Sequence, residues 1–434
     1  RANELNTFFN RFNNNPPTPS GPSTASTTAS TASQSNNPPP PPIILCPTPH
    51  PSPSPPTPPL AFTTDFFTPP TPRTSSHHPQ SPTTTTSCNT HLFAPPSNPP
   101  LTSPTLQSGL HITASQVRRE LERLKQRKAA GPDRISPRVL KACSSQLCGV
   151  LQHLFNLSLH LQRVPVLWKT SCLVPVPKKG HPAALEDYRP VALTSHIMKV
   201  MERLVLAHLR PLVCPSQDPL QFAYQPHVGV DDAIIYLLQK AYSSLDRPNT
   251  SVRIMFFDFS SAFNTIQPRL LKAKLEGTRV SAPLITWVDD YLTGRPQFVR
   301  LQNCVSDRLI SNIGAPQGTV LSPFLFTTYT ADFKHCTESC HLQKFSDDTA
   351  IVGCIEGGRE AEYRDLVDRF VKWCGENRLQ LNVEKTKEMV VDFRRNKPLP
   401  SPVCIGGTDV EVVPAYKYLG ITLDNKLDWS THTE

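Results

Sequence analysis

Two acidic motifs next to strand-like apolar runs constrain the fold of this chain more than any other feature of its sequence. Residues 254–257 are apolar and are followed directly by Asp258, and the pair Asp347-Asp348 stands about ninety residues later between two further runs. A continuous apolar run is typical of a strand with both faces covered, where an ionised carboxylate costs roughly several kcal/mol unless it is compensated. The close spacing around Asp347 and Asp348 predicts a tight hairpin with both carboxylates at its tip.

Divalent metal ions are the natural compensators of such carboxylates. Two unit charges ~4 Å apart repel by roughly 4 kcal/mol at an effective dielectric constant near 20, so converging carboxylates need bound cations or protons. Mg²⁺ prefers carboxylate oxygens, and a pair of ions ~3.5–4 Å apart serves in-line displacement at phosphorus. We therefore interpret Asp258, Asp347 and Asp348 as ligands of two Mg²⁺ ions, or of Mn²⁺, in nucleotidyl transfer.

Other aspartate pairs in the chain have simpler interpretations. Asp231-Asp232 precedes a helical pattern, where acidic side chains suit the positive end of the helix. Asp289-Asp290 lies inside an amphipathic stretch and is expected to face solvent. Because aspartate pairs are common, spacing alone leaves both a metal site and an ordinary acidic turn open.

Further motifs carry a specific resemblance. FFDFSSAFNTI (256–266), GAPQGTVLSP (314–323) and FSDD (345–348) resemble motifs A, B and C of LINE-type (non-LTR retrotransposon) reverse transcriptases, closest to the jockey-like branch. LQLNVEKTK (379–387) is similar to motif D and YKYLGI (416–421) to motif E, the primer grip, while KAAGPD (128–133) and YRPVALT (188–194) resemble finger motifs. Seven motifs in the family's order make chance a poor explanation.

The resemblance implies a right-hand polymerase fold of the α+β class, with helical fingers and an α+β palm that contains the antiparallel acidic hairpin. The implied activity is RNA-directed DNA polymerisation, in which a dNTP is added to a DNA primer on an RNA template. Asp258 and Asp347 would hold both ions with Asp348 in support, although a purely structural Asp348 stays open. Lys385 would protonate the leaving pyrophosphate as a general acid.

The resemblance also implies a nucleotide site. Lys179 and Arg189 would clamp the triphosphate, with Lys178 as the alternative to Lys179. Phe259 and Phe263 of the Asp258 motif would also line this site. Phe263 would exclude a ribose 2′-hydroxyl, and an ordinary core phenylalanine is the alternative interpretation of Phe263.

Two turns complete the implied substrate contacts. Gln317 and Gly318 lie in a turn whose bare backbone lets the base pair approach, and Gln317 can hydrogen-bond in the degenerate minor groove. Tyr418, Leu419 and Gly420 would form the primer grip.

The chain departs from the family pattern at several positions. Arg134 replaces a usual Gly, Gln225 replaces a basic residue, and Ser346 replaces an Ala. No segment resembles the family's endonuclease, and little sequence follows motif E to build a thumb, so we expect that this chain alone does not nick target DNA. A catalytically inactive nucleic-acid-binding remnant and an RNA-dependent RNA polymerase are the alternative functions.

Composition separates two regions. Residues 1–108 hold 27 of the 48 prolines and only five charged side chains, so we expect a disordered linker there and a reverse transcriptase domain over 109–434, with its core at roughly 160–425. The net charge of +9 suits a polyanionic partner without proving one.

The cysteines and the hydropathy bound the cellular setting. The twelve cysteines form no C-x-x-C, so we expect reduced thiols; a zinc site at His335, Cys336, Cys340 and His341 is a weaker alternative to an ordinary connector. Without a long apolar stretch or a signal peptide, the sequence predicts a soluble intracellular protein of the nucleus or cytoplasm that has no membrane partner.

Apolar periodicity predicts the main elements of residues 109–434. The expected helices follow Thr113 and Ser136 and then span 195–213, 229–245, 268–276, 283–292 and 359–378. The expected strands lie at 172–176, 297–301, 389–393 and 416–423, besides the strand before Asp258 and the hairpin at 345–352.

Overall fold

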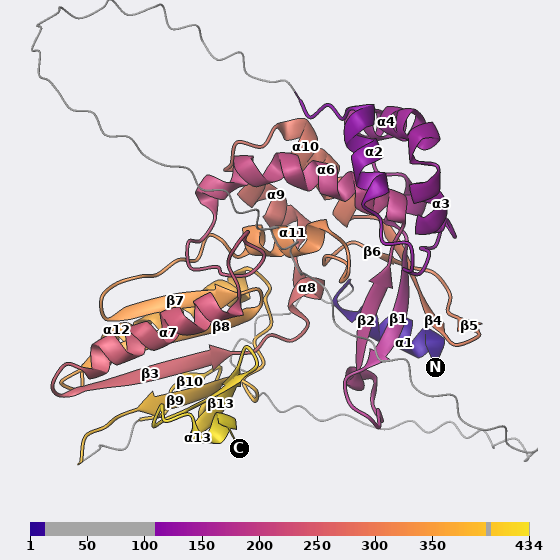
Figure 1. Ribbon diagram of the computed structural model, residues 1–434. Helices are drawn as coiled ribbons and strands as arrows, with labels where there is room; N and C mark the ends of the chain where they lie inside the picture. Colours follow the sequence, from indigo (N-terminus) through magenta and orange to yellow (C-terminus); the bar gives the residue numbers. More distant parts are fainter. Residues whose placement is uncertain (14–108, 396–400, 434) are drawn as a thin grey trace, which may run out of the picture. The chain divides into compact units, whose positions relative to one another are not determined.

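Two five-stranded β-sheets, two small two-stranded sheets and flanking helices make up the described part of the computed structural model, which covers residues 1–13, 109–395 and 401–433 (Figure 1). The helices are α1 (Ala2–Phe9), α2 (Ala114–Glu122), α3 (Pro137–Ala142), α4 (Ser144–Leu161), α5 (Val166–Lys169), α6 (His196–Val213), α7 (Val230–Leu245), α8 (Ala262–Thr265), α9 (Pro268–Glu276), α10 (Ala282–Leu292), α11 (Leu321–Tyr329), α12 (Ala361–Glu376) and α13 (Ser430–Thr433), with short 3-10 turns η1 (Arg11–Asn13), η2 (Leu185–Asp187) and η3 (Cys214–Ser216). The strands are β1 (Ser171–Pro177), β2 (Tyr188–Leu193), β3 (Thr250–Phe257), β4 (Arg295–Leu301), β5 (Cys304–Val305), β6 (Leu309–Ser311), β7 (Cys340–Phe345), β8 (Asp348–Glu356), β9 (Lys387–Val391), β10 (Cys404–Ile405), β11 (Thr408–Asp409), β12 (Glu411–Val412), β13 (Ala415–Tyr418) and β14 (Ile421–Asp424).

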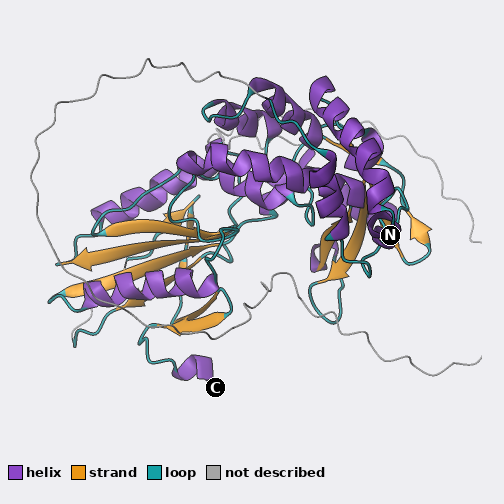
Figure 2. Ribbon diagram, turned by 45° about the horizontal axis from the view of Figure 1, so that its top comes forward, coloured by secondary structure: helices purple, strands orange, loops and turns teal. Residues whose placement is uncertain are grey.

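The β3 sheet has the strand order β12-β9-β3-β8-β7, and all of its pairs are antiparallel except β12 with β9. Its central strand is buried along its whole length. Ile254 and Phe256 face a core shared with α7, whereas Met255 and Phe257 face the core that contains α12. The two helices therefore cover opposite faces of the sheet (Figure 2), which confirms that the apolar run is a strand covered on both sides.

The β1 sheet has the order β2-β1-β4-β5, with β6 paired to the other part of β4. β1 pairs antiparallel with β2 and parallel with β4. Helix α2 packs against α4 and α6, and α5 packs against β4 and α6. The mixture of helices and sheets that the sequence predicts is confirmed, including the antiparallel hairpin of β7 and β8.

Local signals set the helix starts as the sequence predicts. Thr113 forms a capping box with Gln116 at α2, and the Ser136 hydroxyl accepts from the Arg138 amide at α3. The Asp232 carboxylate accepts from the Gly229 amide at the start of α7, so that acidic pair serves a helix end.

Two expectations are wrong. Residues 1–13 do not belong to a disordered arm, because α1 buries Leu5 and Phe9 against the β1 sheet; the composition of residues 1–108 as a whole hides this short apolar pattern. Asp290 does not face solvent freely, because its Oδ2 accepts from the Lys169 ammonium at 3.0 Å and from the Val164 amide at 2.8 Å. The rest of the expected arm, residues 14–108, lies outside the described residues.

In the ranges that the structure describes, no helix combines the length and the apolar character needed to cross a membrane.

Candidate active site

The three predicted carboxylates come from the same end of the β3 sheet. Phe257 pairs with Thr349 in the β3–β8 register, so Asp258 and Asp348 are the next residues of these two strands at that end. Phe345 pairs with Asp348, which leaves Ser346 and Asp347 as a two-residue turn. The predicted tight hairpin is confirmed, and its geometry places the aspartate pair beside Asp258.

Ser346 adopts a conformation that is unusual for its residue type. Its φ is +61°, the left-handed region that this hairpin class requires at its first turn position and that glycine usually fills. The buried Gln221 side chain accepts from the Ser346 amide at 2.9 Å and donates to the Ser346 carbonyl at 3.3 Å. The Tyr224 hydroxyl lies 3.0 Å from the Ser346 hydroxyl. The turn that carries Asp347 is thus held by the segment beside β7.

A buried ion pair anchors the same hairpin from below. The Lys344 ammonium donates to Asp218 at 2.7 Å and to the carbonyls of Thr330 and Phe333 at 2.7 and 2.6 Å. Both partners of the pair are only 2% exposed. Removing either one would leave the other charge buried without compensation, so the pair fixes the position of β7.

The segment after α12 holds the backbone of Asp258. The Asn382 amide donates to the Asp258 carbonyl at 2.8 Å, and the Asp258 amide donates to the Thr386 hydroxyl at 3.4 Å. This turn carries the exposed Lys385, whose positive charge acts on Asp258. The predicted general acid therefore lies in the electrostatic environment of the carboxylates.

The electrostatics of the carboxylates reflect their crowding. Partial removal from water, followed by the negative charges of Asp347 and Asp258, raises the pKa of Asp348 to about 6. The Asp348 residue is exposed to solvent, but neighbouring protein atoms displace part of the water around its carboxylate. Burial and the charge of Asp347 also raise the pKa of Asp258, while Lys385 and Lys178 act in the opposite direction.

The donor chemistry of this group fits Mg²⁺, because all three side chains offer carboxylate oxygens whose repulsion a cation relieves. Over residues 1–13, 109–395 and 401–433, however, no three acidic, histidine or cysteine side chains are already gathered closely enough to hold an ion. The three carboxylates affect one another's pKa values, but they are not yet close enough together to coordinate one ion.

Two lysines at the end of β1 differ in their surroundings. Lys179 donates to Asp187 at 2.9 Å. Lys178, in contrast, lies in the electrostatic environment of Asp258, Lys385, Arg189 and Arg11. Burial and these neighbouring cations lower the pKa of Lys178. Lys179 is thus paired with Asp187, whereas Lys178, the alternative that the sequence left open, is the lysine of the two whose charge acts on Asp258.

The turn before α11 depends on its glycines. Gly318 has φ +100°, and an added Cβ would lie 3.1 Å from the Ala192 carbonyl oxygen. Gly314 has φ +73°, and an added Cβ would meet the backbone of Asn264 at 2.8 Å. The Gln317 carbonyl accepts from the Ala192 amide at 3.0 Å. This turn is bare because two other backbone segments approach it closely.

A buried carboxyl group of α6 holds the end of this turn through hydrogen bonds to its backbone. Glu202 of α6 is fully buried, and its Oε2 accepts from the amides of Val320 and Leu321 at 2.5 and 3.0 Å. Burial raises the pKa of Glu202, whereas these two hydrogen bonds lower it. The Glu202 carboxyl group caps the start of α11 and ties it to α6.

The two phenylalanines of the Asp258 segment have different neighbours. Phe263 is half-buried and stacks on Phe326 with ring centroids 4.8 Å apart. Phe259 packs edge-on against Phe370 at 6.4 Å, which directs its ring toward the core around α12. Phe263 is partly exposed, and its carbonyl accepts from the Ala315 amide at 2.8 Å, which places its backbone beside the Gly314 turn.

The β13–β14 hairpin lies next to the carboxylates. Tyr418 pairs with Ile421, so Leu419 and Gly420 form a two-residue turn with φ +50° and +93°. Tyr416 stacks on Phe256 at 4.2 Å, and Tyr418 is buried with its hydroxyl 3.3 Å from Gln343 Nε2.

Charge links this hairpin to the site. Burial, then the negative charges of Asp348 and Asp258, raise the pKa of Tyr416. Tyr416 and the predicted primer-grip residue Tyr418 therefore lie at the same end of the β3 sheet as the aspartates.

The departures from the family pattern have visible local consequences. Arg134 has φ +57°, the left-handed conformation that a glycine adopts without strain. Gln225 donates to the Gln221 carbonyl at 2.8 Å, so the uncharged side chain folds back on its own segment.

Comparison with known proteins identifies the family. The model of the family "Reverse transcriptase (RNA-dependent DNA polymerase)" matches residues 176–423, more than half of the chain. The chain therefore belongs to the reverse transcriptase family, whose members generally use divalent metal ions.

Curated relatives agree with the LINE-type resemblance. The chain is similar to the probable RNA-directed DNA polymerase from transposon BS of Drosophila melanogaster, with 28% identity over 75% of this chain and 38% of that protein. It is similar to the RNA-directed DNA polymerase from mobile element jockey of the same species, with 28% identity over 74% of this chain and 36% of that protein. The transposon X-element protein of that species is 29% identical over 75% of this chain and 37% of its own length. The chain thus spans less than two fifths of these relatives.

Among solved structures, the chain matches the telomerase from Candida tropicalis in complex with a TWJ fragment of telomeric RNA, with 13% identity and a TM-score of 0.41. The match covers 68% of this chain and 49% of that one.

Sequence reasoning missed several residues that position the site. Gln221, Glu202 and Thr386 act through buried hydrogen bonds to backbone groups of distant segments. A single buried polar residue gives no periodic signal, and only the pairing of 220–222 with β7 reveals Gln221. Thr386 lies inside the motif at 379–387, but the motif does not show that the Thr386 hydroxyl accepts from the Asp258 amide.

Proposed function

We propose that this chain is the RNA-directed DNA polymerase of a non-LTR retrotransposon, which transfers a nucleotide from a dNTP to the 3′-hydroxyl of a DNA primer on an RNA template. The observation that carries the proposal is the convergence of Asp258, Asp347 and Asp348 at one end of the β3 sheet, inside the region that matches the family. In this assignment the β3 sheet is the palm and the β1 sheet with α2–α6 forms the fingers, within a domain that combines residues 1–13 with residues 109–434.

Asp258, Asp347 and Asp348 would hold two Mg²⁺ ions, and Mn²⁺ would substitute. Bound there, the ions would lower the pKa of the primer hydroxyl and neutralise charge on the leaving pyrophosphate. Lys178 rather than Lys179 would bind the triphosphate together with Arg189, and Lys385 would donate a proton to pyrophosphate.

Other residues would shape the substrate site. Phe263 would stand against a ribose 2′-hydroxyl, whereas Phe259 would support motif A through its contact with Phe370. Gln317 and Gly318 would face the base pair, and the turn of Leu419 and Gly420, backed by Tyr418, would hold the primer end.

Primer extension on poly(rA)/oligo(dT) with dTTP and Mg²⁺ tests the proposal. We expect Asp347→Asn to reduce extension by about a thousandfold or more while duplex affinity changes little, because the carboxylate serves charge that develops in the transition state. Asp289→Asn is the matched control, since it changes the first member of another aspartate pair on α10. Equal extension by Asp347→Asn and the parent chain would refute the assignment.

A further inference from the structure

The N-terminal segment is built into the β1 sheet region through a row of asparagines at helical spacing. Asn3 exchanges hydrogen bonds of 2.9 Å with Asp307, through the Asp307 amide and carboxylate. Asn6 is 1% exposed, donates to the Asp307 carbonyl at 2.8 Å and accepts from Gln297 at 3.1 Å. Asn10 donates to the Ile310 carbonyl at 3.3 Å. One face of α1 thus pairs with the polar groups of the segment around β6.

The same segment continues this contact past the end of α1. The Asn312 amide donates to the Asn13 side chain at 2.8 Å. On its apolar face, α1 buries Leu5 and Phe9 with Leu173 and Val299 of the sheet. Because polar and apolar faces are both matched, residues 1–13 are a defined part of the fold.

This docking brings a cation to the segment that follows Asp258. Arg11 donates through Nη2 to the Ser261 hydroxyl at 3.3 Å, and Ser261 stands three residues after Asp258. Its guanidinium lies 3.8 Å from the Phe8 ring centroid and 4.3 Å from that of Phe12. Arg11 also lies in the electrostatic environment of Lys178, which in turn acts on Asp258.

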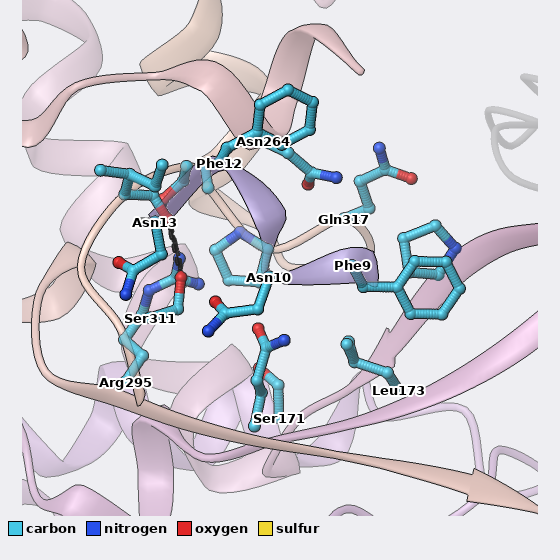
Figure 3. A pocket seen from close by; sticks show the side chains of 16 residues that line it. Phe9, Asn10, Phe12, Asn13, Ser171, Leu173, Asn264, Arg295, Ser311 and Gln317 are labelled. Carbon is cyan, nitrogen blue, oxygen red and sulfur yellow. Dashed lines mark hydrogen bonds between the residues drawn. The ribbon is translucent and has the colours of Figure 1, made fainter. Parts of the chain in front are cut away.

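The neighbouring pocket shows the same approach of the N-terminal segment to the site (Figure 3). Its cavity of about 30 Å³ is lined by Phe9, Asn10 and Phe12 together with Asn264 and Gln317. Asn264 belongs to the Asp258 segment and Gln317 to the glycine turn, so residues 9–13 border both motifs.

We propose that residues 1–13 complete the nucleotide site, with Arg11 as a third cation that binds the triphosphate of the incoming dNTP beside Lys178 and Arg189. This inference rests on the proposed polymerase function. The guanidinium lies against two rings and donates to the Ser261 hydroxyl and, through Nη1, to the Phe8 carbonyl at 2.7 Å, so its remaining N–H donors are held in a fixed plane, which suits phosphate oxygens. The alternative ligand with phosphate oxygens that Arg11 could bind is the phosphate backbone of the template. The contact with the Asp258 segment favours the triphosphate.

Equilibrium binding of dTTP tests this inference without chemistry. The full chain is loaded with poly(rA)/oligo(dT) whose primer ends in a dideoxynucleotide, in Mg²⁺, and dTTP is titrated. We expect Arg11→Gln to raise the dissociation constant of dTTP about tenfold and Arg11→Lys to raise it less than about threefold, since Lys keeps the charge. Arg1→Gln on the same segment is the matched control and is expected to leave the constant unchanged.

Leu5→Ser provides an independent route, because it undocks α1 without touching any cation and is expected to weaken dTTP binding as Arg11→Gln does. Equal weakening by Arg11→Lys and Arg11→Gln, or no weakening by either, would overturn the inference. It would also be overturned if duplex affinity fell instead of dTTP affinity, or if the parent chain bound no dTTP. Failure of the proposed function has a separate signature, namely extension that survives Asp347→Asn.

Discussion

Two ion pairs of the β3 sheet region are buried, whereas the ion pair of Lys179 at the end of β1 lies at the surface. Lys344 and Asp218 are each 2% exposed beneath the carboxylate hairpin, and Arg253 forms a bidentate pair with the fully buried Glu388 in the same sheet. Lys179, at the end of β1, is 57% exposed and pairs with Asp187 at the surface.

The difference follows from what each region is proposed to hold. Carboxylates that share metal ions must keep fixed positions, and buried networks that lose stability when broken provide that fixity. Cations that receive and release a triphosphate must stay accessible to water and able to move. The buried ion pairs of the β3 sheet region would hold the carboxylates in position, and the exposed cations at the end of β1 would bind and release the triphosphate.

The largest expected effect is on stability, from breaking the buried pair. Lys344→Met leaves Asp218 buried and unpaired, so we expect the free energy of unfolding to fall by about 3–5 kcal/mol in urea titrations. Lys179→Met in the β1 sheet region is the matched control and is expected to match the parent chain, because its pair is exposed. Similar losses in both variants would break the comparison.

A buried histidine gives the β3 sheet region its own pH dependence. His341 is 1% exposed, and burial, followed by the charges of Lys240 and His335, lowers its pKa from 6.5 to about 4. Because the unfolded chain then binds the proton more tightly, this contribution to stability is complete above about pH 6.5 and is lost as pH falls toward 4.

Thermal or urea unfolding between these pH values measures the effect. We expect His341→Phe, which keeps a ring against Tyr236, to remove a slope of up to about 1.4 kcal/mol per pH unit. His181→Gln, at the exposed end of the β1 sheet region, is the matched control. An unchanged slope in His341→Phe would show that this imidazole is not held neutral.

The smallest effect concerns nucleotide selection, where the two regions meet. Phe263→Val removes the exposed part of a ring, so we expect ribonucleotide incorporation relative to dNTP incorporation to rise about tenfold in single-nucleotide extension. Phe333→Val, which loses a similar half-buried aromatic contact with Phe370, controls for packing. If both variants keep the parent ratio, Phe263 is a core residue and the RNA polymerase alternative gains support.

The sequence predicted the β3 sheet region better than the β1 sheet region. An apolar run, a tight hairpin and a helix start are local properties, so the carboxylate hairpin and the start of α7 followed from neighbouring residues. The docking of α1 depends on asparagines that bond to a segment about three hundred residues away, as Asn3 does with Asp307. The choice between Lys178 and Lys179 depended on the position of Asp187 across the β1–β2 connection, which spacing alone does not fix.

Manganese binding followed by electron paramagnetic resonance tests the central claim most directly, because it reports the ions rather than their catalytic consequence. In the presence of template–primer with a dideoxy end and dTTP, we expect Asp258→Asn and Asp347→Asn each to weaken Mn²⁺ binding about tenfold or more, with Asp289→Asn equal to the parent chain. Equal Mn²⁺ affinity in the parent chain and in Asp258→Asn would contradict a metal centre at the end of the β3 sheet.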